Sequence, residues 1–227
     1  DVYKRQLVHW RRRGSRAIVL MRPSLPLRLF DLCIEPRHDG GSESARRWMS
    51  TGPINRMRPA ATRGEQGVIL IGGPSPHYAW DGAALLGQLA AICDGSRAWT
   101  LSTSRRTPGD FLPALHDLQL PRLQAHAADD LPADWLARAL PSATVCWVSP
   151  DSASMVYEAL TAGCAVGVFD LAAESGSRVA RGVQALLDEG RCAPFAALVA
   201  GRPPTAAGEP LAEADRIAAR IVELGWL

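Results

Sequence analysis

The sequence predicts an α/β protein built on an open, doubly wound parallel sheet. From Gly67 onward, short apolar runs of strand length alternate with segments of helix length. The apolar runs are continuous, as expected for strands that are covered on both faces. Strands separated by helical crossovers pair in parallel with right-handed connections, so the alternation indicates a layered α/β domain.

Composition limits the class of protein. The 227 residues are 47% apolar, which suffices for one large domain, or for one domain with part of another. A net charge of +2 gives no electrostatic reason to expect a nucleic-acid partner. The five cysteines are widely spaced without a CxxC pair, which predicts buried, reduced thiols and a cytoplasmic location. We find no apolar stretch long enough to cross a bilayer, no signal peptide and no metal-ligand spacing among the histidines.

Residues 1–62 carry a weak pattern. Leu7–Trp10, before three arginines, is typical of the end of a helix, whereas Asp1–Gln6 shows no pattern. Ala17–Met21 and Leu32–Pro36 are predicted strands, and the polar region Glu43–Ser50 shows no strand pattern. We interpret residues 1–62 as the last part of a truncated N-terminal domain, ending where residues 60–66 become polar and aperiodic.

Residues 63–205 form the second predicted domain, and residues 206–227 form a helix that packs back on the domains. The predicted strands are Val68–Ile71, Ala98–Ser102, Leu123–Ala127, Val145–Val148 and the apolar run ending at Phe169. The predicted helices are Asp81–Ile92, Asp110–Leu118, Ala133–Ala139, the segment from Ser152 to Gly163, and Gly176–Glu189. Apolar residues along one face of Leu211–Leu224 predict the final amphipathic helix.

The candidate ligand-binding residues lie on three loops predicted at the carboxyl edge of the sheet, where open parallel sheets bind ligands. They are Gly72, Gly73, Ser75, Ser104, Arg105, Arg106, Asp151, Ser152 and Ser154. Asp151 or Ser152 is a natural N-cap, and the free amides and dipole of the helix that follows would seat a phosphate or carboxylate. Glu158 lies further along this helix, within reach of a ligand at its start.

Purely structural interpretations remain open for these residues. The glycine pair is also typical of a tight turn, the serines of simple caps, and Glu158 of a solvated helix position. Of the adjacent Arg105 and Arg106, only one is expected to face inward. Neither a GxGxxG fingerprint nor a P-loop is present.

Two histidines are weak catalytic candidates. His77 precedes Asp81, a predicted N-cap, and Trp80, which we expect in the core or in a hydrophobic staple. His38 stands beside Asp39 and could form an acid/base pair. No Ser/His/Asp set can be assembled from the spacing.

Five motifs together carry a resemblance to a known family. In order they are Phe30–Asp39, Thr51–Arg56, Leu70–Asp81, Thr103–Pro108 and Ser149–Met155. Their combination resembles bacterial members of the mitochondrial fission ELM1-like family, which in turn resembles GT-B glycosyltransferases with two Rossmann-like domains facing a cleft. The resemblance implies that this chain keeps the end of the first domain and a nearly complete second one. It also implies a donor diphosphate near Ser152, Ser154 and Met155, with Glu158 holding the ribose.

Three functions follow as hypotheses. The first is a GT-B-type glycosyltransferase that takes a nucleotide-sugar donor as substrate and uses no cofactor. Metal independence is expected because no DxD carboxylate pair lies near the phosphate edge. The alternative is a non-catalytic adaptor with a protein partner, since plant relatives are associated with recruiting a dynamin-related protein; peripheral association with the inner membrane fits either hypothesis. An epimerase is the weakest hypothesis, because the dinucleotide fingerprint is missing.

Overall fold

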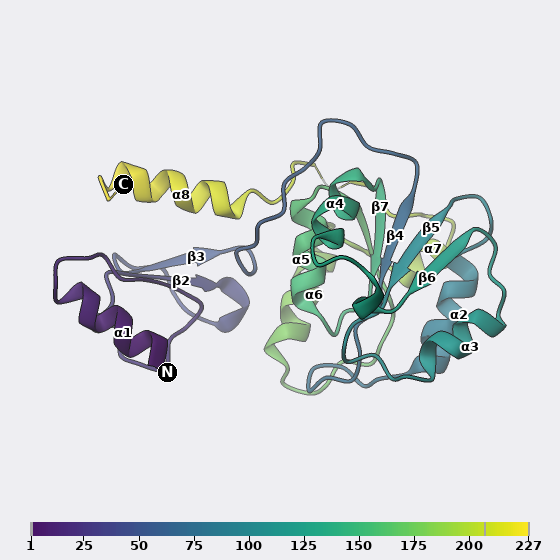
Figure 1. Ribbon diagram of the computed structural model, residues 1–227, viewed down its shortest axis with the longest axis horizontal. Helices are drawn as coiled ribbons and strands as arrows, with labels where there is room; N and C mark the ends of the chain where they lie inside the picture. The colour runs from purple at the N-terminus through teal and green to yellow at the C-terminus, as the bar shows by residue number, and fades with distance from the viewer. Residues whose placement is uncertain (1, 207, 227) are drawn as a thin grey trace. The chain divides into compact units, whose positions relative to one another are not determined.

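The structure is a computed structural model that describes residues 2–206 and 208–226, with side chains from Gln6 onward. It divides the chain into two compact units (Figure 1). Unit 1 comprises Asp1–Asn55 and Ala212–Leu227, and unit 2 comprises Arg56–Leu211. Both are α/β units with all-parallel sheets, which confirms the predicted Rossmann-like α/β class.

Unit 1 is a three-stranded sheet covered by one helix on each face. Its strands are β1 (Ile18–Leu20), β2 (Leu32–Pro36) and β3 (Arg47–Ser50), in the order β1-β2-β3. Helix α1 (Val2–Arg11) places Leu7 and Val8 against Val19 and Cys33 on one face. Helix α8 (Glu213–Glu223) places Ile217 against the other face, so segments far apart in the sequence cover the two faces of one sheet. The single-turn helices η1 (Leu27–Leu29) and η2 (Arg37–Asp39) lie in its loops.

Polar contacts hold α8 in place. The Glu213 carboxylate accepts a hydrogen bond from the Thr51 amide at 2.8 Å and pairs with Arg216 at 2.7 Å. Arg216 also donates to the Met49 carbonyl at 2.7 Å. Burial works to raise the pKa of Glu213, but the hydrogen bonds from Arg216 and Thr51 hold it below its ordinary value.

Unit 2 is a six-stranded parallel sheet with the order β6-β5-β4-β7-β8-β9. The strands are β4 (Gly67–Leu70), β5 (Trp99–Ser102), β6 (Leu123–His126), β7 (Val145–Val148), β8 (Ala165–Val168) and β9 (Ala193–Pro194). The chain builds outward from β4 to β6, then returns to the other side of β4 to add β7 and its successors. The strand order therefore reverses between β4 and β7, which is where doubly wound sheets bind ligands.

Helices cover both faces of the larger sheet, as Figure 1 shows. They are α2 (Gly82–Ile92), α3 (Phe111–Asp117), α4 (Trp135–Ser142), α5 (Ala153–Thr161), α6 (Arg178–Asp188) and α7 (Phe195–Val199), with a single turn η3 (Ala128–Asp130). Alternate residues of β4 face opposite ways. Val68 and Leu70 join the core under α4, α5 and α6, whereas Ile69, with Ile71 just beyond the strand, joins the core under α2, α3 and α7. This two-sided burial explains the continuous apolar runs.

Three local predictions were wrong. Helix α1 already begins at Val2, although Asp1–Gln6 showed no pattern; Leu7 and Val8 anchor it in the core. Strand β3 lies within the region judged to lack a strand. Its apolar residues, Trp48 and Met49, stand between Arg47 and Ser50, and so short a run shows no strand pattern. Strand β9 and helix α7 were not predicted, since Pro194 obscures the junction between them.

Candidate functional site

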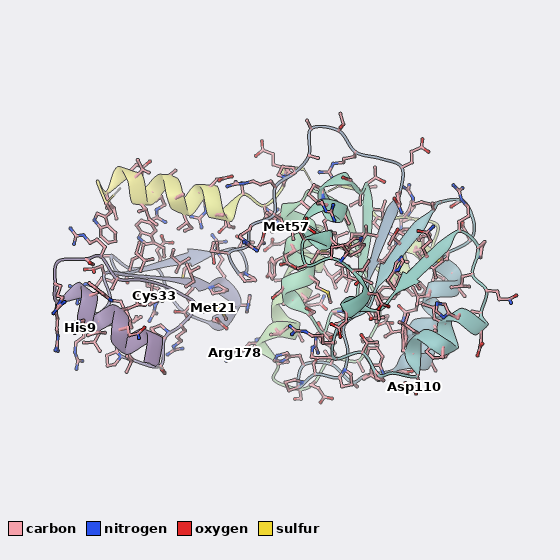
Figure 2. All side chains as sticks on the ribbon, viewed as in Figure 1. His9, Met21, Cys33, Met57, Asp110 and Arg178 are labelled. Carbon is pink, nitrogen blue, oxygen red and sulfur yellow. The ribbon has the colours of Figure 1, made fainter. Side chains whose placement is uncertain are left out.

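A cavity of about 360 Å³ lies at the point where the strand order of unit 2 reverses. It is lined by Pro74, Ser75, Pro76, His77, Arg106, Asp151, Ser152, Ala153, Ser154 and Val179. These residues come from the loops after β4, β5 and β7 and from the first turns of α5 and α6. In Figure 2, Asp110 and Arg178 mark where α3 and α6 begin, on this same edge of the sheet. We call it the switch-point cavity.

The loops after β4 and β7 are joined by buried hydrogen bonds. The Gly72 amide donates to Ser149 Oγ at 2.7 Å, and the Gly73 amide donates to Asp151 Oδ2 at 2.9 Å. Both glycine amides therefore already have protein partners. They hold the wall of the cavity together.

Asp151 and Arg106 form the centre of this wall. Arg106 Nη2 lies 2.8 Å from Asp151 Oδ2, and Nη1 donates to the Gly73 and Pro74 carbonyls at 3.0 and 2.9 Å. The Asp151 side chain is only 1% exposed, and its second oxygen, Oδ1, has no hydrogen-bond partner among the described residues. The Thr107 hydroxyl, one residue beyond Arg106, donates to the Gly72 carbonyl and so ties the third loop to the other two.

The close approach of these loops requires glycine at both positions. A Cβ on Gly72 would lie 2.5 Å from Asp151 Cγ, and one on Gly73 would lie 2.7 Å from the Thr107 amide nitrogen. Neither position has room for a side chain. The physical reason for the glycine pair is thus the packing of backbone against Asp151 and the β5 loop.

The start of α5 faces the cavity with its polar groups. Ser152 occupies the N-cap position, but its hydroxyl accepts no hydrogen bond from the first turn. The predicted cap is therefore absent: the Asp151 carboxylate is held by Gly73 and Arg106 instead, and the Ser152 side chain makes no hydrogen bond to the turn it precedes. The first amides of a helix have no intrahelical acceptor, so this end of α5 presents donors and the positive end of its dipole.

The remaining predicted residues lie around this cavity without all lining it. Ser104 bonds within its own loop to the Arg106 amide and to Thr107, whereas Arg105 is exposed on that loop. Met155 packs against the core beneath α5, and Glu158 lies half-buried one turn further along that helix. Burial raises the pKa of Glu158 above its ordinary value.

The two histidine candidates lie in different units. His77 lines the switch-point cavity, and its Nδ1 is 3.2 Å from Ser177 Oγ, the N-cap of α6. The predicted cap of α2 is confirmed, since Asp81 accepts a hydrogen bond from the Ala84 amide at 2.9 Å. Trp80 packs edge-on against Phe111. His38 lies in η2, at the carboxyl end of β2 in unit 1.

A larger cavity, of about 470 Å³, lies beyond β8 on the same edge of the sheet. Its apolar lining includes Phe169, Leu171, Val183, Leu187 and Phe195, and its polar lining includes Asp170, Glu174, Ser177, Arg181 and Gln184. We call it the β8 cavity. Sequence reasoning missed it, because its residues are spread over β8, α6 and the unpredicted β9–α7 segment; the polar stretch directly after the buried strand β8 was the one available signal.

The described residues contain neither a metal-binding cluster nor a membrane-spanning helix. No group of three or more His, Cys, Asp or Glu side chains within residues 6–206 and 208–226 is arranged to hold a metal ion. No helix in the described part of the chain is long and apolar enough to cross a membrane.

Comparison with known proteins identifies the family. No curated protein matches the chain significantly. The sequence profile of the family described as "Mitochondrial fission ELM1" matches residues 2–224, which is nearly the whole chain and includes both units and the switch-point cavity. The chain therefore belongs to the mitochondrial fission ELM1 family.

Proposed function

We propose that unit 2 binds a nucleoside-diphosphate-linked sugar and that this chain is a glycosyltransferase-like protein of GT-B type. The observation that carries the proposal is the coincidence of the switch-point cavity with the start of α5. A doubly wound sheet binds its ligand where the strand order reverses, and a helix N-terminus at that place favours a phosphate group.

The diphosphate would lie against the first turn of α5. The amides of this turn and the hydroxyls of Ser75, Ser152 and Ser154 supply neutral donors around the cavity. The charge of Arg106 is already balanced by Asp151. Arg105, exposed on the same loop, is the guanidinium we assign to the diphosphate.

Glu158 would hold the ribose of the donor. It follows Ser154 by four residues on α5, and residues spaced in this way lie on the same face of a helix. Little water reaches a half-buried carboxylate, so vicinal hydroxyls of a ligand compete well for its hydrogen bonds. The donor is a substrate here, and the proposal includes no cofactor.

A thermal-shift screen against UDP-, GDP-, ADP-, CMP- and dTDP-linked sugars tests this function. A ligand at 100 times its Kd stabilises the folded protein by about 2.7 kcal/mol, which such a screen detects. Replacing both Ser152 and Ser154 by Ala should weaken binding at least about 100-fold, since each hydroxyl bonded to a charged phosphate contributes about 1.5 kcal/mol or more. Ser175→Ala is the matched control, because Ser175 is exposed and lies outside the lining of the switch-point cavity.

A negative screen would refute the proposal. If no nucleotide sugar shifts the unfolding temperature, a non-catalytic adaptor becomes the better hypothesis. The next measurement would then be a search for a protein partner. A shift that the double serine variant leaves unchanged would place the ligand elsewhere and would equally contradict the assignment to α5.

A further inference from the structure

We propose that the β8 cavity binds a carbohydrate ring through its vicinal hydroxyls. At about 470 Å³ the cavity lies within the range of small-molecule sites. It combines an apolar floor with a rim of hydrogen-bonding side chains. None of the candidate ligand-binding or catalytic residues predicted from the sequence lines it.

The apolar floor of the β8 cavity contains an aromatic ring whose orientation is fixed by packing. Phe195 is half-buried and lines the cavity, and its ring lies 6.0 Å from that of Trp147 at an interplanar angle of 70°. Trp147 is itself 1% exposed and packs against Phe169. An aromatic ring held this way presents a rigid apolar surface for the C–H face of a sugar.

The rim holds a carboxylate whose backbone is clamped. The side-chain amide of Gln88 donates to the Asp170 carbonyl at 2.8 Å, and its oxygen accepts from the Asp170 amide at 2.8 Å. Gln88 is only 8% exposed, so this pair fixes Asp170, the second residue after β8, against α2. The Asp170 side chain then stands at the cavity from a fixed backbone.

The charges of the lining select among ligands. Two carboxylates, Asp170 and Glu174, disfavour an anion in this cavity. Arg181, which donates to the Gly176 carbonyl at 3.0 Å, offsets one of these two negative charges and adds hydrogen-bond donors to the rim. A purely apolar ligand would leave these groups unpaired at a cost. A neutral ring with hydroxyl groups satisfies both the floor and the rim, because carboxylates accept two hydrogen bonds from adjacent hydroxyls.

The β8 cavity adjoins the switch-point cavity, because residues that line one contact residues that line the other. His77 lines the switch-point cavity, Ser177 lines the β8 cavity, and the two side chains lie 3.2 Å apart. Pro150 and Asp151, neighbours in sequence, likewise line one cavity each. One ligand can therefore span both, with its phosphates in one and a sugar in the other; this extension rests on the proposed function, whereas carbohydrate binding by itself does not.

The test compares Asp170→Asn and Phe195→Ala with Asp129→Asn, an exposed control outside the lining of the β8 cavity. Saturation-transfer NMR of the full chain with free ribose and with methyl glucoside reports sugar binding without any nucleotide. Both cavity variants should reduce the transfer at least about threefold while the control leaves it unchanged. Equal transfer in all four proteins, or none in the unsubstituted protein with either sugar, would overturn the proposal.

Calorimetry then shows which sugar ring of a nucleotide sugar, the transferred sugar or the ribose, occupies the β8 cavity. With UDP-glucose and UDP as probes, Asp170→Asn should weaken binding about 10-fold, the equivalent of one charged hydrogen bond. A loss for UDP-glucose alone assigns the cavity to the transferred sugar, and an equal loss for both assigns it to the ribose. Nucleotide binding with no loss for either probe would overturn the extension to a ligand that spans both cavities, while leaving the proposed function intact. Saturation transfer to a free sugar, together with no binding of any nucleotide sugar in the thermal-shift screen, would refute the proposed function alone.

Discussion

Replacing Gly72 by Ala should destabilise unit 2 and dislocate the switch-point cavity. The added Cβ would lie 2.5 Å from Asp151 Cγ, a distance that real Cβ atoms do not show. Asp151 cannot easily retreat, because its carboxylate is 1% exposed and is held by the Gly73 amide and by Arg106. Overpacking of this kind costs about 1–3 kcal/mol, and loss of a hydrogen bond to a buried charge costs about 1.5–3 kcal/mol. We therefore expect a loss of about 2–4 kcal/mol, allowing for partial relaxation.

Gly87→Ala is the matched control. Gly87 lies in the interior of α2 with nothing within 4 Å of the added Cβ. Alanine there should stabilise the protein by about 0.5–1 kcal/mol, because glycine is a poor helix former. The same substitution thus has opposite signs at two positions of one unit.

Urea unfolding followed by tryptophan fluorescence measures both variants, and hydrogen exchange assigns the change to unit 2. In Gly72→Ala, amides of residues 71–73 and of the first turn of α5 should exchange faster than in the unsubstituted protein. The reasoning fails if Gly72→Ala unfolds at the same urea concentration as the unsubstituted protein, or if both variants are stabilised.

Three further substitutions test other parts of the structure. Because burial raises the pKa of Glu158, the folded protein binds this proton more tightly than the unfolded chain does, so stability falls as the pH rises above 4.5 through the raised value. Glu158→Gln should remove that fall, so the stability of the variant relative to the unsubstituted protein should increase with pH in urea unfolding. A difference in stability that does not increase with pH would contradict this expectation. Gly167→Ala would place a Cβ 2.5 Å from the buried Trp147 ring and should cost about 1–3 kcal/mol, with a changed tryptophan emission as its signature. Ile217→Ala should cost about 2–5 kcal/mol in unit 1, and protease cleavage within α8 should speed up; unchanged cleavage would show that Ile217 does not anchor the helix.

The sheet of unit 2 was predictable from sequence because its strands are buried on both faces. Runs such as Val145–Val148 have no polar interruption, and periodicity identifies them without knowledge of their partners. Helices with a side-chain cap, such as α2 after Asp81, were equally accessible. In unit 1 the pattern is weak: β3 has only Trp48 and Met49 as apolar residues, and the burial of Trp48 depends on contacts with α8 from the far end of the chain.

The position of the candidate site was predictable from the sequence, but its hydrogen bonds and its ion pair were not. Parallel strands bring their following loops to one edge, so sequence order sufficed to gather Ser75, Arg106 and Ser152 there. Nothing local indicates that Asp151 would turn away from the helix it precedes and pair with Arg106, because that choice depends on loops 45 residues apart in sequence. The same limit hid the β8 cavity, whose lining includes Phe195 from a segment without a strand pattern.

The division of the chain has a consequence for the order in which it folds during synthesis. In the sequence, all of unit 2 lies between the two segments of unit 1, so α8, which supplies Ile217 to the core of unit 1, is translated after unit 2. Domains fold as units once their residues have emerged. Unit 2 can therefore complete its core on the ribosome, while the strands of unit 1, although made before unit 2, wait with one face of their sheet uncovered. A nascent chain stalled after residue 211 should carry a protease-resistant unit 2 and a protease-sensitive N-terminal segment.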